Sequence, residues 1–183
     1  MEPQLVRLSK FLSRTLRHRP QAIGLTLDQN GWVQVDELLA GAARAHVPLT
    51  RELLERVVAE NDKQRYAFNA DHTKLRANQG HTVRVDLELA PQAPPEILYH
   101  GTSRKSLASI RAQGLHPGKR MHVHLSGDTA TATRVGARHG SPVVLRVEAS
   151  RMHAQNFVFY CAVNGVWLTE RVPREFIGFP PEE

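Results

Sequence analysis

A proline-rich stretch, APQAPPE at residues 90–96, separates two halves of the chain with different residue patterns. Its three prolines disfavour a helix or a central strand and favour an extended, stiff connection. Helical periodicity dominates before this stretch, and short strand-like runs dominate after it. We therefore expect two lobes, residues 1–89 and 97–183, joined by a linker over 90–96. A chain of 183 residues is long enough for a modest core in each lobe.

The first lobe is expected to contain three helices before residue 61. Apolar residues spaced three and four apart predict a helix that ends just before Pro20, and they are Leu5, Leu8, Leu12 and Leu16. Asp36 is expected to cap a second helix over residues 37–45. Thr50 is expected to cap a third helix that extends to Val58.

A β-hairpin is expected to follow these helices. Residues 63–80, KQRYAFNADHTKLRANQG, contain two short strand-like runs on either side of the polar turn 69–71. Helices followed by a hairpin are the order of a winged-helix module. Such modules bind nucleic acid in some proteins and are structural or protein-interaction units in others, so the order alone leaves the role of this lobe open.

The second lobe is expected to be an α+β domain with a mostly antiparallel sheet. Runs rich in β-branched and aromatic residues predict five strands, ILYH, HVHLS, PVVLRVEA, FVFYCAV and VWLTE. The pair Asn164-Gly165 is a hairpin-turn signal between the last two strands. Two short helices are expected between the strands, one after Ser103 and one after Asp128.

An excess of basic residues points to a polyanionic partner. The chain has 24 lysines and arginines against 18 acidic residues, which gives a formal net charge of +6. Arginine supplies most of this excess, and its planar guanidinium suits bidentate contacts with phosphate. A generally basic surface that serves only solubility is the alternative explanation.

Nothing in the sequence predicts a membrane or an oxidising environment. No run approaches the roughly 18 apolar residues that a membrane helix needs, and the first residues, MEPQLVRLSK, lack the apolar core of a signal peptide. Cys161 is the only cysteine, so it cannot form an internal disulfide. We expect a cytoplasmic protein, monomeric and without a membrane partner.

Several familiar catalytic sites are missing from the sequence. It has no glycine-rich phosphate loop followed by Lys-Ser/Thr, no pair of cysteines and no His-Glu-x-x-His helix. His122 and His124 would share one face of a strand, but no convincing third ligand accompanies them, so we expect no metal. The absence of an obvious carboxylate base argues against glycosidase or aspartyl chemistry.

What remains is a set of basic side chains beside polar loops in both lobes. Before the linker these are Arg17, His18 and Arg65, and after it His100, Arg120, His122 and His124. Such a set suits a reaction in which the substrate carries the nucleophile and the negative charge, while the protein supplies cations that hold it. A phosphate monoester is a substrate of this kind.

Six motifs together resemble the tRNA 2'-phosphotransferase family. They are LSKFLSRTLRHRP, KQRYAF, RANQGH, LYHGTS, RMHVHLS and NGVWLTE, in this order, and the resemblance extends from about residue 5 to residue 178. It implies an N-terminal winged-helix lobe that binds RNA and a C-terminal ADP-ribosyltransferase-like lobe that binds NAD⁺ as co-substrate. The implied active site lies in the cleft between the lobes.

The resemblance also implies that the motif His100-Gly101-Thr102 holds the nicotinamide side of NAD⁺. The glycine would let the backbone come close to a planar ligand, with the hydroxyls of Thr102 and Ser103 nearby. Ordinary turn and helix-capping chemistry is the alternative for Gly-Thr-Ser.

Further positions around NAD⁺ follow from the same resemblance. His124 resembles the second motif position of ADP-ribosyltransferases and Val166 the third, which is apolar in this family, so that the attacking phosphate needs no carboxylate base. Ser126 is expected to line the NAD⁺ pocket. Ile110 and Gly114 are expected to border the adenosine or, more simply, to shape and end the helix after residue 103.

The reaction that the resemblance implies has two steps. The RNA 2'-phosphate attacks C1'' of the NAD⁺ ribose and expels nicotinamide, and O2'' of that ribose then attacks the phosphorus. RNA leaves with a free 2'-hydroxyl, and ADP-ribose 1'',2''-cyclic phosphate is the other product. The first step needs mainly positioning, and the second needs stabilisation of charge on the transferring phosphoryl group.

By motif match, Arg17, His18, Arg65 and Arg120 form the catalytic group. The arginines are expected to clamp the phosphate, with Arg17 and Arg65 on the surface of the cleft, and His18 to donate to the phosphate or shuttle a proton. Arg134 and Arg138 are the alternatives to Arg120. The residues expected to face the RNA or the cleft are Arg76, Asn78, Gln79 and His81, for which a simple turn role is the alternative.

Two other functions remain open at the level of sequence. One is an ADP-ribosyltransferase that stops after the first step and caps a terminal phosphate of RNA or DNA. The other is a winged-helix nucleic-acid binder whose second lobe is not catalytic. The motifs of both lobes are present together, and binding alone would not require this.

Overall fold

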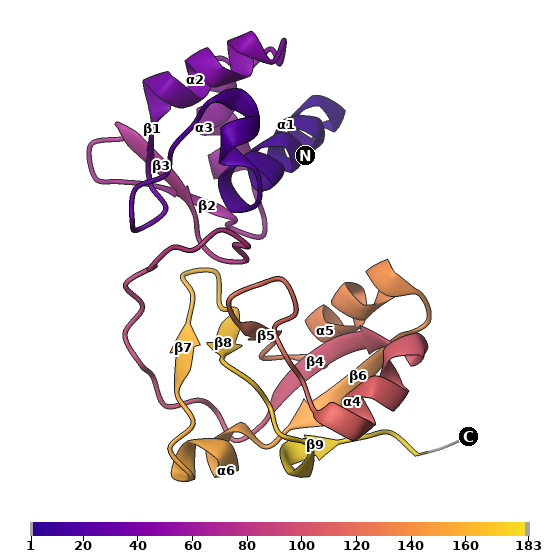
Figure 1. The fold of residues 1–183 in the computed structure, drawn as a ribbon. Coiled ribbons are helices and arrows are strands. Elements are labelled where there is room, and N and C mark those ends of the chain that lie inside the picture. Colours follow the sequence, from indigo (N-terminus) through magenta and orange to yellow (C-terminus); the bar gives the residue numbers. More distant parts are fainter. Residues whose placement is uncertain (1, 182–183) are drawn as a thin grey trace. The chain divides into compact units, whose positions relative to one another are not determined.

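The computed structural model describes residues 2–181, apart from the side chain of His139, and the chain forms two compact units that meet in sequence between Glu88 and Leu89 (Figure 1). Each unit has its own hydrophobic core. Every pair of named strands in the described residues is antiparallel, and helices accompany the sheets, which confirms the α+β class. Within residues 2–181, none of the helices combines the length and apolar character that crossing a membrane requires.

The first unit consists of helices packed with a small sheet. Its helices are α1 (Pro3–Arg17), the 3-10 helix η1 (Pro20–Ile23), α2 (Val35–Arg44) and α3 (Arg51–Ala59). Its strands are β1 (Val33–Gln34), β2 (Tyr66–Phe68) and β3 (Lys74–Ala77), in the order β1-β3-β2. The predicted hairpin is therefore confirmed, and β1 adds a third strand beside it.

The leucine stripe and one of the two predicted helix caps are confirmed. Leu5, Leu8, Leu12 and Leu16 are all buried in the first core. The Leu53 N–H donates to Thr50 Oγ1 over 3.2 Å, as expected of a capping residue.

The predicted cap at Asp36 is wrong, because α2 already begins at Val35, one residue before Asp36. The start is set by the sheet. Gln34 pairs with Lys74 across β1 and β3, and the Val35 N–H then donates to Thr73 O. Asp36 lies in the first turn of α2, where its carboxylate is stabilised by the helix dipole without capping the backbone.

The second unit contains two three-stranded sheets and short helices. The sheet β4-β6-β9 contains β4 (Leu98–Ser103), β6 (Pro142–Val147) and β9 (Ile177–Gly178), and the sheet β5-β8-β7 contains β5 (Val123–Leu125), β8 (Trp167–Thr169) and β7 (Phe159–Cys161). The helices are η2 (Arg104–Ser106), α4 (Leu107–Gln113), α5 (Thr129–Gly136), η3 (Ala137–His139), α6 (Ala149–Ala154) and η4 (Arg174–Phe176).

The five predicted strands of this unit are present, but their bounds differ; the run ILYH, for example, ends at His100, whereas β4 continues to Ser103. The run PVVLRVEA was expected to be a strand to its end, but β6 ends at Val147 and α6 begins at Ala149. Ala149 and Met152 are fully buried, so burial favours a turn into the core at this point over a longer strand. Gly165 adopts a φ of +74°, and its N–H donates to Ala162 O, in the predicted turn between β7 and β8.

The proline-rich stretch 90–96 belongs to the second unit. Pro91 forms an isolated bridge with Tyr160, and the Gln92 N–H donates to Phe159 O over 2.8 Å. Proline is tolerated beside a strand only at an edge, where its missing N–H costs no ladder bond. The sequence predicted a linker separate from both lobes, and the structure instead places this stretch along the edge strand β7.

Strand β4 and helix α5 approach each other closely at two glycines (Figure 1). A Cβ on Gly101 would lie 1.8 Å from Ala132 O, and a Cβ on Gly136 would lie 2.5 Å from Thr102 O. Both positions therefore require glycine for reasons of packing inside the second unit. This differs from the expectation that Gly101 makes room for a planar ligand, and any contact of Gly101 with NAD⁺ stays a prediction.

The substitution Gly101→Ala tests this packing. We expect it to destabilise the second unit by about 3 kcal/mol, at the upper end of overpacking effects, because the new Cβ would meet a backbone carbonyl that cannot rotate away. Urea unfolding of a Trp32→Phe background, in which Trp167 reports on the second unit, measures the change. Gly127→Ala is the control, since no atom lies within 4 Å of its added Cβ. Equal unfolding midpoints for the two variants would contradict the packing role.

Candidate functional site

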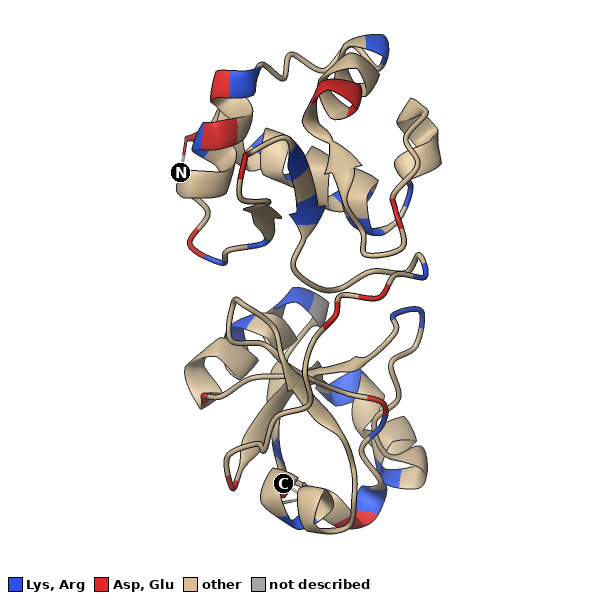
Figure 2. Cartoon of the chain, turned by 90° about the vertical axis from the view of Figure 1, so that its left-hand side faces the viewer, with Lys and Arg blue, Asp and Glu red and all other residues tan. Residues whose placement is uncertain are grey.

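The C-terminal end of α1 lies in a cluster of basic residues of the first unit. Arg17 is the last residue of α1 and His18 caps it, Arg65 precedes β2, Arg76 lies on β3, and His81 follows β3. We call these five residues the basic cluster. Figure 2 shows that lysines and arginines also occur on other parts of both units.

Arg17 is held in place by the loop that follows β3. Its carbonyl oxygen accepts hydrogen bonds from the N–H groups of Thr82 (2.8 Å) and Val83 (3.4 Å). Gly80, with a φ of +88°, passes beside the guanidinium, where a Cβ would lie 3.5 Å from Nη1. Arg17 is consequently only 9% exposed. The loop therefore covers Arg17, and its expected place on the surface of the cleft stays a prediction.

His18 is the exposed member of the cluster, and the same loop orients its ring. The Thr82 hydroxyl donates to Arg17 O over 3.3 Å, and His18 Nδ1 lies 3.1 Å from that hydroxyl oxygen. Because the hydroxyl proton is used on Arg17 O, the hydroxyl oxygen accepts from His18 and the proton of the ring lies on Nδ1.

A buried amide orients the guanidinium of Arg65. Asn61 is 3% exposed, and its Oδ1 accepts from Arg65 Nη1 over 3.1 Å and from the Lys63 N–H over 3.2 Å. Its Nδ2 donates to Ser9 Oγ on α1 over 3.1 Å. Asn61 is not among the site residues predicted from the sequence. The signal that could have revealed it is Ser9, a hydroxyl residue on the otherwise apolar face of α1.

The backbone of Arg65 links the other members of the cluster. Its carbonyl oxygen accepts from Arg17 Nη2 over 3.4 Å and from the Asn78 N–H over 2.9 Å. The Arg17 guanidinium therefore lies next to the backbone of Arg65, and the phosphate clamp formed by the two residues stays a prediction. Guanidinium groups that lie close together offer several planar N–H donors to an anion such as phosphate.

His81 is a buried member of the basic cluster, and its pKa is lowered. Burial, and then the charges of Arg17, His18 and Arg76, lower the pKa of His81 to about 4. Within residues 2–181, its buried Nε2 and the buried Nε of Arg76 have no hydrogen-bond partner. Three positive groups act on one histidine, and an anion is the natural complement of such a region.

The four residues predicted to face RNA divide into two pairs. Asn78 and His81 are buried, and the Asn78 amide donates to Gln64 O over 2.6 Å, so the Asn78 side chain bonds within the unit. The loop needs this internal bonding to lie over Arg17. Gln79 and Arg76 are half-buried, and the Arg76 guanidinium stacks 4.4 Å from the Trp32 ring. Contacts of any of the four with RNA stay predictions.

In the second unit, His100 on β4 is oriented by a neighbouring strand. Its Nδ1 lies 3.0 Å from the carbonyl oxygen of His124 on β5. A carbonyl only accepts, so Nδ1 carries the proton and Nε2 of the neutral ring is an acceptor. Burial lowers the pKa of His100, and the bond to His124 opposes this only in part. His100 is therefore neutral at pH 7 and suited to accept a bond from a ligand hydroxyl or amide.

Arg120 and His124 form a second contact of this site. Arg120 Nη1 lies 3.4 Å from His124 Nδ1, which must be the acceptor because a guanidinium only donates. Burial of its guanidinium and the charge of Arg138 lower the pKa of Arg120. Residue 120 is nevertheless solvent-exposed overall, and arginine stays protonated at neutral pH.

Arg134 and Arg138, the alternatives to Arg120 in the catalytic group, have different surroundings. Arg134 Nη2 donates to Thr131 Oγ1 over 2.9 Å, within its own helix α5. Arg138 instead lies close enough to Arg120 for its charge to act on the Arg120 guanidinium. Arg120 and Arg138 therefore belong to one positive region of the second unit.

The other residues predicted to bind NAD⁺ lie beside strands β4, β5 and β8 or in the core of the second unit. Ser126 bridges Tyr99 between β5 and β4, Val166 precedes β8, and Thr102 and Ser103 are buried at the end of β4. Ser103 makes no side-chain cap, so its hydroxyl does not serve the helix that follows.

Ile110 and Gly114 have packing roles. Ile110 is buried in the second core. Gly114 ends α4 with a φ of +78°, and a Cβ there would lie 2.3 Å from Val172 O. This agrees with their expected role in shaping and ending the helix. A contact of either residue with the adenosine of NAD⁺ stays a prediction.

His122 and His124 have different surroundings. The His122 ring lies edge-on to Tyr160, with ring centroids 5.7 Å apart. Burial lowers the pKa of His122, and the charge of Glu170 raises it. In the described part of the chain, no three His, Cys, Asp or Glu side chains come together in a way that could hold a metal ion.

Comparisons with known proteins agree over nearly the whole chain. A protein-family model described as "RNA 2'-phosphotransferase, Tpt1 / KptA family" matches residues 3–171. A Nostoc punctiforme protein named "Probable RNA 2'-phosphotransferase" is 53% identical over 176 residues, which cover 96% of this chain and 97% of the relative. Proteins with the same name from Streptomyces coelicolor and Pseudomonas aeruginosa are 52% and 56% identical, over 98% and 92% of this chain and 97% and 93% of their own lengths.

The pKa of His81 predicts a dependence of stability on pH. The unfolded chain binds a proton at His81 near pH 6.5, whereas the folded first unit binds it only near pH 4. Protonation therefore favours unfolding, so this stability is complete above pH 6.5 and is lost as the pH falls to 4. Between pH 7 and pH 4 we expect wild type to lose about 3 kcal/mol more stability than His81→Gln.

Urea unfolding in a Trp167→Phe background measures this difference, because Trp32 then reports on the first unit. His46→Asn is the control, since His46 is exposed and asparagine tolerates its φ of 55°. We expect the control to lose as much stability as wild type. An identical loss in all three proteins would contradict the burial of a neutral His81.

Proposed function

Because the chain belongs to the RNA 2'-phosphotransferase, Tpt1 / KptA family, we propose that it transfers an internal 2'-phosphate of RNA to NAD⁺. The products are RNA with a 2'-hydroxyl, nicotinamide and ADP-ribose 1'',2''-cyclic phosphate. The family membership makes the protein a transferase that acts on RNA. The co-substrate, the intermediate and the roles of single residues are the further content of the proposal.

The observation that carries the proposal is the ordered pair of guanidiniums in the basic cluster. The Arg17 guanidinium bonds to the carbonyl oxygen of Arg65, and the Arg65 guanidinium bonds to the amide oxygen of Asn61. A phosphate dianion accepts the planar N–H donors of two guanidinium groups.

Three residues of the basic cluster have a role in the proposed reaction. Arg17 and Arg65 hold the 2'-phosphate in position for attack on C1'', so no base is needed to make it a nucleophile. In the second step they stabilise the charge that develops on the phosphoryl group. His18 is exposed, and an imidazole can donate to the phosphate or transfer a proton.

The residues of the second unit fit a dinucleotide. His100 offers a neutral ring with an acceptor at Nε2, and the hydroxyls of Thr102 and Ser103 lie on the same strand. Arg120, with Arg138 near it, supplies positive charge for phosphate groups. NAD⁺ would supply the ribose carbon that accepts the phosphate. The chain's own residues bind and orient the two substrates and hold their charge.

We also infer the folds that the family resemblance implies for the two units. The helices and the three-stranded antiparallel sheet of the first unit are compatible with a winged helix that binds RNA. The two sheets and short helices of the second unit are compatible with an ADP-ribosyltransferase-like domain.

The identity of the products tests the proposed function. Incubation of the protein with NAD⁺ and an oligoribonucleotide carrying an internal 2'-phosphate is followed by mass spectrometry. The expected products are the 2'-hydroxyl RNA and ADP-ribose cyclic phosphate. A persistent ADP-ribosylated RNA would instead support an enzyme that stops after the first step, and unchanged RNA would support a protein that only binds nucleic acid.

A charge-preserving substitution tests the phosphate clamp. Arg65→Lys keeps the positive charge but loses the planar fork, so we expect phosphate removal to fall at least about a hundredfold. Thermal unfolding followed by circular dichroism shows whether the fold is retained. Arg51→Lys is the matched control, because Arg51 pairs with Glu55 on the exposed side of α3. Wild-type turnover by Arg65→Lys would show that Arg65 is not part of the clamp.

A further inference from the structure

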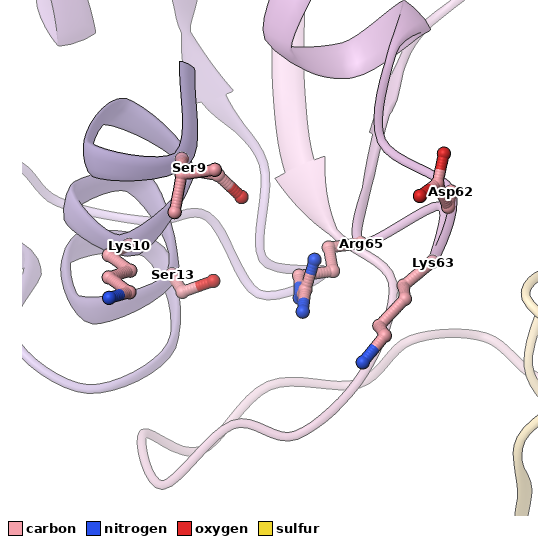
Figure 3. A pocket seen from close by; sticks show the side chains of 7 residues that line it. Ser9, Lys10, Ser13, Asp62, Lys63 and Arg65 are labelled. Carbon is pink, nitrogen blue, oxygen red and sulfur yellow. The ribbon is translucent and has the colours of Figure 1, made fainter. Parts of the chain in front are cut away.

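A pocket lies next to Arg65, within the first unit. It has a volume of about 360 Å³ and is bordered by one face of α1 and by the segment that leads into β2 (Figure 3). Its polar lining residues are Ser9, Lys10, Ser13, Asp62, Lys63 and Arg65. The roles proposed above use only Arg65 from this set.

Positive charge dominates this pocket. Its lining contains three cationic side chains and one carboxylate. In Figure 3 the nitrogen ends of Lys10, Arg65 and Lys63 extend on the same side of the pocket as the Ser13 hydroxyl, and the carboxylate of Asp62 points away from them. Ammonium, guanidinium and hydroxyl groups together are the usual donors to a phosphate group.

The wall of the pocket is fixed by buried hydrogen bonds. Tyr66 is 3% exposed, and its hydroxyl contacts the carbonyl oxygen of Ser9 and lies 2.7 Å from Ser13 Oγ. Asn61 joins Ser9 to Arg65. These bonds connect α1 to the segment before β2, so they hold together the two parts of the chain that border the pocket.

The pocket continues along α1 toward the phosphate clamp. Val6, Ser9, Ser13 and Arg17 follow one another at spacings of three and four residues, so they lie on one face of the helix. Arg65 belongs to both places, since it lines the pocket and its carbonyl oxygen binds Arg17. An anion in the pocket and an anion at the clamp would therefore be neighbours.

We propose that this pocket binds a backbone phosphate of the RNA, one that flanks the nucleotide carrying the 2'-phosphate. The proposal rests on the proposed function, which brings the 2'-phosphate to Arg17 and Arg65. A strand anchored there carries its next phosphates along the adjacent surface. The lining has no aromatic ring on which a base could stack, so it suits the sugar-phosphate backbone and not a base.

The pocket adds a subsite that does not depend on base identity. Phosphate contacts position a nucleic acid without reading its sequence. Under this proposal the enzyme prefers a 2'-phosphate inside an RNA strand to one on an isolated nucleotide, and it accepts any flanking sequence.

Lys10→Ala tests the subsite, with Arg7→Ala as the matched control. Both residues are exposed on α1, and only Lys10 lines the pocket. The substrates are 2'-phosphorylated hexanucleotides in which single flanking phosphates are replaced by neutral methylphosphonates. For wild type we expect one replacement to raise KM about tenfold, as for the loss of one charge-assisted bond. Lys10→Ala should raise KM equally for the unmodified hexanucleotide and be insensitive to that same replacement.

Other results of this experiment would overturn the assignment. If the effects of Lys10→Ala and of every methylphosphonate simply multiply, Lys10 does not contact a flanking phosphate. If Lys10→Ala raises KM for NAD⁺ and leaves KM for RNA unchanged, the pocket holds a phosphate of the dinucleotide instead. An effect of Arg7→Ala as large as that of Lys10→Ala would show only a general response to net charge.

A binding measurement separates this proposal from the proposed function. If wild type releases no phosphate from any hexanucleotide, the proposed function fails, and fluorescence anisotropy with an unphosphorylated hexanucleotide decides on the pocket. Loss of one phosphate contact lowers the slope of log affinity against log salt concentration by about 0.7 for a single strand. We expect this reduction for Lys10→Ala and not for Arg7→Ala, and equal slopes in all three proteins would refute the pocket as an RNA subsite.

Discussion

The attachment of residues 78–83 to the end of α1 is the contact on which the basic cluster depends. The carbonyl oxygen of Arg17 accepts from two backbone N–H groups of this loop, and the carbonyl oxygen of Arg65 accepts from a third. These bonds satisfy carbonyls at a helix end and beside a strand, which would otherwise be buried without partners. They also hold positively charged side chains close together despite their repulsion. Burial, and then these charges, lower the pKa of His81.

In the second unit, glycines allow the close contact that positions His100. The backbone of α5 comes so close to β4 that Gly101 and Gly136 have no room for side chains. This contact holds rigid the strand that carries His100, and the carbonyl oxygen of His124 then sets which ring nitrogen of His100 is protonated. In both units, neutral backbone and amide oxygens orient these side chains.

Local sequence patterns predicted most elements, because they report short-range preferences. The leucine stripe of α1, the Thr50 cap and the turn at Gly165 all follow from residues close in sequence. Patterns failed where a distant segment decides, as when β3 sets the start of α2 at Val35, or when burial of Ala149 and Met152 ends β6. The proline-rich stretch reads as a linker because its pairing with β7 involves residues far along the chain.

The sequence by itself determined the α+β class, the order of helices and strands, the basic character and, through its motifs, the family. Only the tertiary structure decided that Arg17 is covered, that Asn61 orients Arg65, and that Ser9 and Ser13, which Tyr66 contacts, border a positive pocket. The reason is that periodicity records which face of an element is apolar, whereas a hydrogen bond between residues 9 and 61 exists only once α1 and the segment before β2 have packed together.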